Sequence, residues 1–287
     1  MNPERSGLVP GLYLVSTPIG NARDITLRAI DVLRAADVLA AEDTRSLKRL
    51  MEILGIPLGD RPCLAYHDHN GARMRPRLMA LLAEGKSVAY ASEAGTPMIS
   101  DPGFDLARAA REEGHLVTAA PGVSAVVTAL TLAGLPTDRF LFAGFLPNAK
   151  GARRNALAAL KQEAATLAFY ESPKRLGAML ADAATALGGD RRAAVCRELT
   201  KRFEEVREGT LDELAEVYAE TPPKGEIVVL IGKGSSEKIS ESDLEEELQA
   251  ALGEMSVRDA ADYVAQANGI ARRPVYQLAL KLAKERG

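Results

Sequence analysis

Short apolar runs recur along the first part of the chain, and a polar turn and an amphipathic segment follow each of them. The runs lie at 11–16, 37–41, 62–66, 87–91 and 116–119. They are separated by roughly 25–30 residues, the length that a helix needs to connect two parallel strands. The pattern therefore predicts an α/β fold with a mostly parallel sheet that is doubly wound, with helices on both faces.

The second half of the chain has a different order of elements. Strands are expected at 140–145, 166–170, 193–197, 204–208 and 226–231. Because some of these runs follow one another like hairpin strands while helical patterns separate the others, we expect a mixed sheet. We place an N-terminal α/β domain at 1–120 and a second α/β domain at 121–235.

Residues 236–287 are expected to form a linker and a small helical extension. The stretch 232–242 is polar and rich in Gly and Ser, which is typical of a linker. Helical patterns follow at 243–252, 257–267 and 273–284, with a turn at Asn268-Gly269. A helix-turn-helix unit and a helical hairpin packed on the main body fit this pattern equally well.

Composition narrows the classes of protein to consider. The chain has 287 residues, 47% of them hydrophobic, and a net charge of −3, which argues against a general polyanion binder. No apolar run reaches the roughly 18 residues of a membrane span, and residues 1–10 lack the apolar core of a signal peptide. Cys63 and Cys196 are far apart, so we expect two reduced thiols and a cytoplasmic protein.

The most distinctive loop is SEAGTPMISDPG at 92–103, directly after the apolar run 87–91. Gly95 and Gly103 permit unusual backbone conformations, the two prolines stiffen the loop, and Ser and Thr supply hydrogen-bonding groups. Open α/β sheets bind ligands at the carboxyl ends of their strands. We therefore interpret this loop as the centre of a binding site.

Three other polar turns are expected at the same edge of the sheet, at 17–21, 42–45 and 67–71. The first contains a single glycine, so it lacks the glycine-rich fingerprint of dinucleotide-binding proteins, and no P-loop occurs. His67 and His69 hint at a metal, but the sequence places no third ligand near them, so a turn or a substrate contact is favoured.

Nine sequence blocks, in order along residues 11–232, match a known pattern. They are LYLVSTPIGNARDIT (12–26), AEDTR (41–45), YHDHN (66–70), SEAGTPMISDPG (92–103), PGVSA (121–125), GLPTDRFLFAGFLP (134–147), YESPKR (170–175), RELTKRFEE (197–205) and GEIVVLI (225–231). With these blocks the chain resembles the tetrapyrrole methylase superfamily of S-adenosylmethionine (SAM) methyltransferases. Within it, the chain is similar to the small-subunit rRNA cytidine 2′-O-methyltransferase family. Glu93 stands where that family usually has Asp.

The resemblance implies that SAM binds in a concave, mostly apolar site between the two domains. The residues implied to contact it are Pro18, Ile19, Ser92, Glu93, Ala94, Gly95, Thr96, Ile99, Ser124, Ala125, Phe169, Tyr170, Leu199 and Gly225. It also implies a homodimer, no metal, and methyl transfer to the ribose 2′-hydroxyl of a decoding-centre cytidine in 16S rRNA of the small ribosomal subunit.

A hydroxyl is a poor nucleophile, so the reaction needs close alignment and gains from a proton acceptor. The candidates, which the sequence does not rank, are Asp43, His67, Asp101 and Glu171, and a purely positional mechanism stays open. Cations at the crevice rim and in the tail are expected to contact RNA. They are Arg23, Arg45, Lys174, Arg175, Arg197, Lys201, Arg272, Arg273 and Lys281.

Two other functions fit the same sequence. One is a methyltransferase that acts on a tetrapyrrole precursor of the precorrin type, with the same fold and cofactor. The other is a SAM-binding or ribosome-binding module without enzymatic activity. The basic blocks at 170–175 and 197–202 and the helical tail favour RNA as the substrate.

Overall fold

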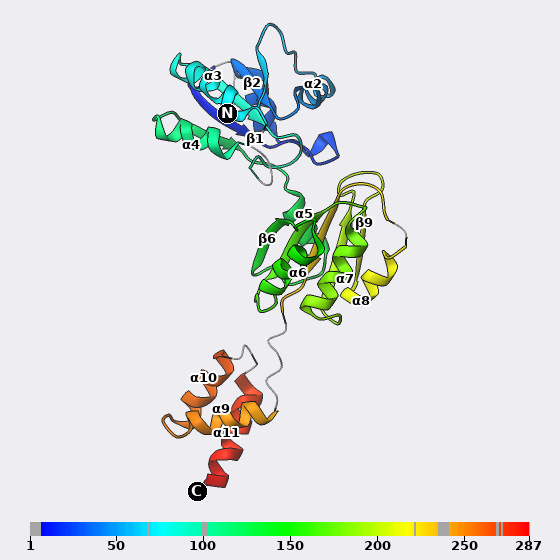
Figure 1. Cartoon of the computed structure of the whole chain (residues 1–287). Coiled ribbons are helices and arrows are strands. Elements are labelled where there is room, and N and C mark those ends of the chain that lie inside the picture. The colour runs from blue at the N-terminus through cyan, green and yellow to red at the C-terminus, as the bar shows by residue number, and fades with distance from the viewer. Residues whose placement is uncertain are drawn as a thin grey trace.

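The computed structural model describes residues 7–67, 69–98, 103–220, 222–234, 241–267, 270 and 272–286. Its elements form three groups that follow one another along the chain, and we name the first two the first and second α/β units (Figure 1). Ile99, Asp101 and the turn at Asn268-Gly269, on which expectations were placed, lie outside the described residues.

The first α/β unit holds a five-stranded parallel sheet of order β3-β2-β4-β1-β5. Its strands are β1 (Gly11–Val15), β2 (Val38–Ala41), β3 (Cys63–Ala65), β4 (Ser87–Ala91) and β5 (Val117–Ala120). Its helices are the 3₁₀ turn η1 (Ala22–Asp24) and α1 (Leu27–Ala35), α2 (Thr44–Ile53), α3 (Gly71–Ala83) and α4 (Phe104–Glu112). The prediction of a parallel sheet is confirmed.

Helices cover both faces of this sheet because alternate strand residues point to opposite sides. Leu39 and Ala89 belong to the core cluster that includes residues of α1 and α2. Their neighbours Val38 and Val88 belong to the cluster that includes residues of α3 and α4. The strands are apolar on both faces, as is usual for buried parallel sheets, and the doubly wound arrangement is confirmed.

The second α/β unit holds a mixed sheet of order β6-β7-β10-β8-β9, in which β6 and β7 are parallel and the other pairs are antiparallel. Its strands are β6 (Phe140–Phe145), β7 (Thr166–Glu171), β8 (Arg192–Arg197), β9 (Glu205–Thr210) and β10 (Ile227–Ile231). Its helices are α5 (Ala125–Leu132), α6 (Lys150–Ala159), α7 (Leu176–Leu187) and α8 (Leu211–Val217). Residues of α6, α7 and α8 share one core cluster with this sheet, and residues of α5 share the other (Figure 1).

Three helices follow the second unit: α9 (Glu241–Ala251), α10 (Val257–Ala267) and α11 (Arg272–Arg286). They pack around a cluster of their own, which includes Leu248, Val264 and Val275. In the described part of the chain, no helix combines the length and the apolar character that crossing a membrane requires. The domain limits after residues 120 and 235 stay a prediction.

Candidate cofactor and RNA site

Three loops of the first unit meet because β4, β1 and β5 are neighbours in the sheet. Thr17, after β1, and Gly95, after β4, exchange two backbone hydrogen bonds: Thr17 N–H donates to Gly95 O at 2.9 Å, and Gly95 N–H donates to Thr17 O at 3.0 Å. The Thr17 hydroxyl also donates to Ser92 O at 3.2 Å. The central loop is therefore joined to the first turn of the chain.

Hydroxyl groups tie the third loop, Pro121–Ser124, to the other two. The Thr96 hydroxyl donates to Val123 O at 3.0 Å, and the Thr26 hydroxyl donates to Pro121 O at 3.3 Å. Thr26 is also the N-cap of α1, and Asp24 lies in the preceding turn η1. Neither Thr17 nor Thr26 was among the residues expected to contact the cofactor. Thr17 carried a signal for such a role, because it is a polar residue directly after an apolar run.

The second unit reaches this region through the β8–β9 loop, residues 198–204. Asn21 N–H of the first unit donates to Thr200 Oγ1 at 3.2 Å. Ile19 of the first unit packs in the same core cluster as Leu199 and Ala168 of the second. The first turn of the chain is thus held between the central loop on one side and the β8–β9 loop on the other.

Two ion pairs of Lys201 stabilise the β8–β9 loop. Lys201 Nζ lies 2.8 Å from Glu198 Oε1 and 2.8 Å from Glu226 Oε2. Glu198 Oε1 also accepts a hydrogen bond from Glu226 N–H at 3.0 Å. The hydrogen bond from Lys201, followed by the one from the Glu226 backbone, holds the pKa of Glu198 below its ordinary value. An ionised carboxylate at the base of the loop thus joins it to Lys201 and to the start of β10.

Unusual backbone conformations gather in these loops. Among the described residues, three side chains other than glycine have positive φ: Met98 at 70°, Glu198 at 50° and Thr200 at 65°. Gly225, expected to contact the cofactor, has φ 98°, and a Cβ there would lie 2.3 Å from Glu198 Cδ. Left-handed conformations of such residues are costly and tend to occur at functional sites.

The residues expected to contact the cofactor differ in exposure. Ile19, Ser92 and Leu199 are buried, while Glu93 and Ala94 are exposed. The others are buried or intermediate: Pro18, Gly95, Thr96, Ser124, Ala125, Tyr170 and Gly225. Phe169 is fully buried in the core under α6, α7 and α8, so a contact from this residue has to come from its backbone. Their role in binding the cofactor stays a prediction.

Asp43 caps helix α2 and pairs with a neighbouring arginine. Its Oδ1 accepts a hydrogen bond from Arg45 N–H at 2.8 Å, and its Oδ2 lies 2.9 Å from Arg45 Nη2. The side-chain bond and then the backbone bond from Arg45 lower the pKa of Asp43 to about 2. A carboxylate that holds its proton so weakly is a poor general base at neutral pH and a good hydrogen-bond acceptor.

Glu171 ends β7 and is buried, with 3% of its surface exposed. Its Oε1 accepts a hydrogen bond from Ser172 N–H at 2.7 Å, and its Oε2 lies 3.2 Å from Arg175 Nη2. His67 accepts backbone bonds from Asn70 and Gly71 at its carbonyl, and its ring lies 6.1 Å from that of His69. Within the described ranges, no group of three or more potential metal ligands was found.

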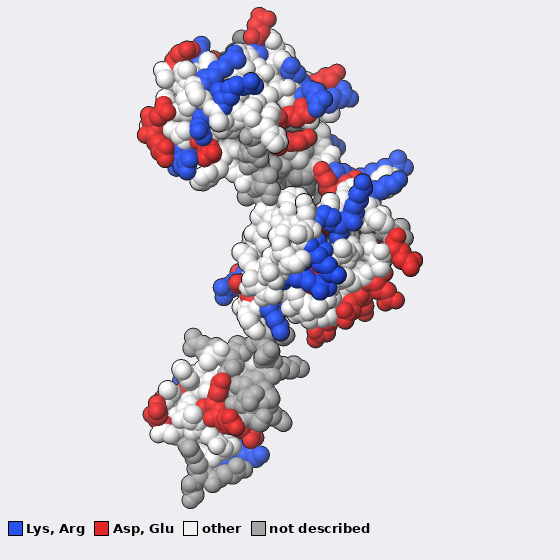
Figure 2. Space-filling model, viewed as in Figure 1, with Lys and Arg blue, Asp and Glu red and all other residues white. Residues whose placement is uncertain are grey.

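Several cations expected at the RNA surface have protein partners. Arg175 donates to Leu146 O at 2.6 Å and to Asn148 Oδ1, and Arg197 pairs with Glu205 at 2.9 Å. Lys201 holds the two glutamates named above, and Arg272 pairs with Asp262. Arg23, Lys174, Arg273 and Lys281 are exposed. Figure 2 shows Lys and Arg side chains gathered at the end of the second unit that lies toward the first.

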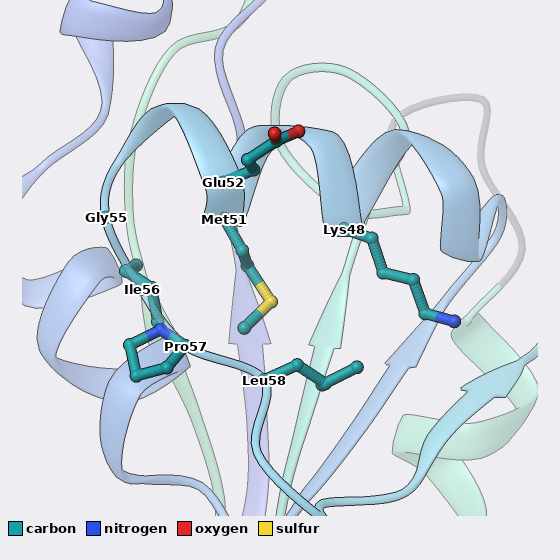
Figure 3. A pocket seen from close by; sticks show the side chains of 7 residues that line it. All are labelled: Lys48, Met51, Glu52, Gly55, Ile56, Pro57 and Leu58. Atoms are coloured by element: carbon teal, nitrogen blue, oxygen red, sulfur yellow. The ribbon is translucent and has the colours of Figure 1, made fainter.

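A surface hollow of about 550 Å³ lies elsewhere, beside the C-terminal end of α2 (Figure 3). Met51 and Leu58 lie on one side of the helix there, and Glu52 points away from them. Helix α2 starts at the carboxyl end of β2 and runs back along the sheet, so this hollow lies at the opposite end from the loops described above. We do not place the candidate site there.

The comparison with protein families agrees with this arrangement of loops and sheets. The model for Tetrapyrrole (Corrin/Porphyrin) Methylases matches residues 11–215, most of the chain. The chain belongs to this family. A second model, described as the RsmI C-terminal HTH domain, matches residues 239–283 of this tetrapyrrole methylase.

Named relatives match over almost the whole length. The tetrapyrrole methylase is 48% identical to Ribosomal RNA small subunit methyltransferase I of Mesorhizobium japonicum, covering 98% of this chain and 95% of the relative. It is 43% identical to the protein of the same name from Pseudomonas aeruginosa, covering 94% of this chain and 96% of the relative. Uroporphyrin-III-C-methyltransferase from Thermus thermophilus is 25% identical, with a TM-score of 0.56 over 78% of this chain and 95% of that one.

Proposed function

We propose that this tetrapyrrole methylase uses SAM to methylate rRNA of the small ribosomal subunit. The acceptor we propose is the ribose 2′-hydroxyl of a cytidine in the decoding centre of 16S rRNA. The observation that carries the proposal is the identity of 41–48% to relatives named ribosomal RNA small subunit methyltransferase I, over 93–98% of the chain. We also propose a cytoplasmic location, because the proposed substrate is part of the ribosome.

The helical extension separates this proposal from a tetrapyrrole precursor as substrate. Two solved structural neighbours, a uroporphyrin-III-C-methyltransferase and a cobalt precorrin-4 methyltransferase, cover 78% and 77% of this chain. The relatives named for rRNA cover more than 90%, and the extension has its own family model at 239–283. An added helical module with exposed Arg273 and Lys281 suits a large anionic substrate.

The residues at the meeting point of the loops suit SAM. When bound, SAM supplies a methyl group on a positively charged sulfonium. Ile19, Leu199 and Tyr170 offer apolar surface, and Ser92, Thr96 and backbone groups offer hydrogen-bond partners. Glycine at position 95 lets the loop backbone pack close to Ile19, because a Cβ there would lie 3.2 Å from Ile19 Cγ2. SAM has no phosphate groups, so its site does not need a glycine-rich phosphate-binding loop.

The protein's own contribution to the reaction is alignment of the acceptor hydroxyl. Asp43, with a pKa of about 2, is suited to orient a hydroxyl or a cation rather than to remove a proton. Glu171 is held by Ser172 and Arg175, and His67 follows β3 at the edge of the sheet. These three residues and Asp101 remain proposed participants in methyl transfer. The cations at the crevice rim remain proposed contacts of the RNA.

The test of the proposed function is mass mapping of ribose methylation on 16S rRNA. Cells without this gene are expected to lack one methyl group on a decoding-centre cytidine, and the plasmid-borne gene is expected to restore it. An assay in vitro checks the substrate directly. It measures transfer of a labelled methyl group from SAM to isolated small subunits and, for comparison, to a porphyrinoid. An unchanged 16S map, or label on the porphyrinoid alone, would refute the proposal.

We also infer that two copies pair through the β6 edge of the second sheet. Edge strand β6 exposes Phe140 by 47% and Phe145 by 58%, and α5, on one face of the same sheet, exposes Val127 by 52% and Leu132 by 43%. A long apolar edge strand is a liability in a monomer, because its unpaired backbone and its side chains invite association. Contact between two copies would bury both the unpaired backbone of β6 and the exposed apolar side chains.

We expect the protein to elute at twice its chain mass of 30.6 kDa in light-scattering chromatography. Phe145→Lys is expected to shift it to the monomer mass because the substitution puts a charge on the apolar edge. Val217→Ala, which removes an exposed apolar side chain from α8, is the control and should not change the mass. A monomeric wild type, or a dimeric Phe145→Lys variant, would contradict this interface.

A further inference from the structure

Phe203 is an exposed aromatic side chain in the β8–β9 loop. The residue is 63% exposed, and the Arg202 guanidinium carbon lies 5.5 Å from the centroid of its ring. Burial of a phenylalanine side chain stabilises a fold, and this exposed position lacks that contribution. Single exposed apolar residues are common, so the exposure gains meaning only from the setting of the loop.

The loop around Phe203 has a fixed shape. Thr200 N–H donates to Glu204 Oε2 at 2.6 Å, and Glu204 N–H donates to Lys201 O at 3.2 Å. Two of its residues, Glu198 and Thr200, hold positive φ angles. Bonds that span Phe203 therefore fold this stretch into a turn, and the turn exposes the ring to solvent.

The loop also lies next to the turn proposed to contact SAM. Thr200 accepts the bond from Asn21, and a Cβ on Gly20 would lie 2.4 Å from Lys201 Cγ. Three residues of extended chain span at most about 10 Å, so Phe203 lies within that distance of Thr200 along the loop. Arg202 beside it is exposed, so a cation and an aromatic face are presented together.

An aromatic face beside a cation is the chemistry that binds an unpaired nucleotide. Sequence-specific RNA binding relies on splayed bases that stack on aromatic rings or on guanidinium planes. Stacking on an aromatic ring accepts any of the four bases, because every base has a π-face. Methylation of a 2′-oxygen within a folded RNA requires access to the ribose, and a base drawn out of its stack gives that access.

We infer that Phe203 is the stacking platform for a splayed base of the RNA substrate, at or beside the methylated nucleotide. The inference rests on the proposed function and makes Phe203 a residue that positions the substrate. It is independent of the identity of the proton acceptor. It also gives the cationic end of the second unit (Figure 2) a role beyond attraction of phosphates.

The test uses the full-length protein, labelled SAM and small subunits from cells that lack this gene. Phe203→Ala is expected to raise KM for the subunit about 10-fold, because one stacked base is lost. The values of kcat and of Kd for SAM are expected to stay within about twofold. Phe203→Trp is expected to restore KM, and Phe203→Leu is not. Ile53→Ala, a 56% exposed side chain at the end of α2, is the control and should leave KM unchanged.

Three results would overturn the inference: an unchanged KM in Phe203→Ala, full rescue by Phe203→Leu, or a change to the monomer mass in Phe203→Ala. The last would assign the ring to contact between two copies. If the wild type itself does not methylate small subunits, the proposed function fails. If it does so and Phe203→Ala behaves like the wild type, only the stacking role fails.

Discussion

Replacing Gly95 with valine is expected to weaken SAM binding about 100-fold. Gly95 has φ 80°, a conformation that costs other residues about 1–2 kcal/mol. A Cβ would lie 3.2 Å from Ile19 Cγ2 and 3.5 Å from Val123 O, so the valine methyls overpack the place where the three loops meet, at about 1–3 kcal/mol. The loop cannot move aside without loss of both backbone bonds to Thr17.

Gly85 offers a matched control for this substitution. It has the same φ of 80°, but nothing lies within 4 Å of a Cβ built there. Gly85→Val therefore carries the same backbone strain without the overpacking, and it should bind SAM as the wild type does. Isothermal titration with SAM measures both variants, and circular dichroism checks that each is folded. A folded Gly95→Val protein with wild-type affinity would show that the central loop does not form the cofactor site.

Replacing Asp182 with alanine is expected to destabilise the second α/β unit by about 3–5 kcal/mol. Asp182 Oδ2 accepts bonds from Arg153 Nε at 2.8 Å and Nη2 at 2.6 Å, and its Oδ1 accepts one from Arg154 Nε at 2.6 Å. The side chains of Asp182 and Arg153 are 4% and 7% exposed. The alanine variant leaves the Arg153 charge buried without a counterion, which is why the loss is large.

Chemical denaturation measures this loss, and the chain supplies two controls. Arg154 is 44% exposed, so Arg154→Ala should cost less than about 1 kcal/mol. The double variant Arg153→Met/Asp182→Leu removes both buried charges and should recover most of the stability. A small effect of Asp182→Ala, equal to that of Arg154→Ala, would contradict the assignment of Arg153 and Asp182 as a buried pair.

The same pair sets a pH dependence. Burial raises the pKa of Asp182, but the hydrogen bonds from Arg154 and Arg153 outweigh it, so the pKa lies below its ordinary value. A carboxyl whose pKa is lower in the folded state stabilises the protein above its unfolded pKa of about 4. This stability is lost as the pH falls through the folded value. The difference between wild type and Asp182→Ala should therefore be constant at neutral pH and shrink below about pH 4.

The sequence predicted the order of elements well because the periodicity is strong. All five strands of the first sheet and the mixed character of the second follow from short apolar runs and their spacing. Element ends were less certain, because helix capping depends on single side chains. Helix α7, for example, begins at Leu176 and not directly after β7, since Pro173 to Arg175 form a turn.

The site was predictable as a set of loops and not as a set of contacts. The spacing of the strands brings Thr17, Gly95 and Val123 to one edge, and this could be anticipated. The partners of Arg175 and Lys201 could not be, because Asn148 and Glu226 lie more than twenty residues away in the chain. The positive φ angles of Glu198 and Thr200 carry no sequence signal, since neither residue is a glycine.

The separate core of α9, α10 and α11 has a consequence for how such enzymes diversify. Among the described residues, the nine buried members of this cluster, from Leu248 to Leu282, all lie within these three helices. A gene fusion that exchanges this module would leave both sheets and their loops intact. If the extension binds RNA as proposed, selection can change the macromolecule that it recognises without changes to the loops of the two sheets. The extension has a family model of its own, at 239–283.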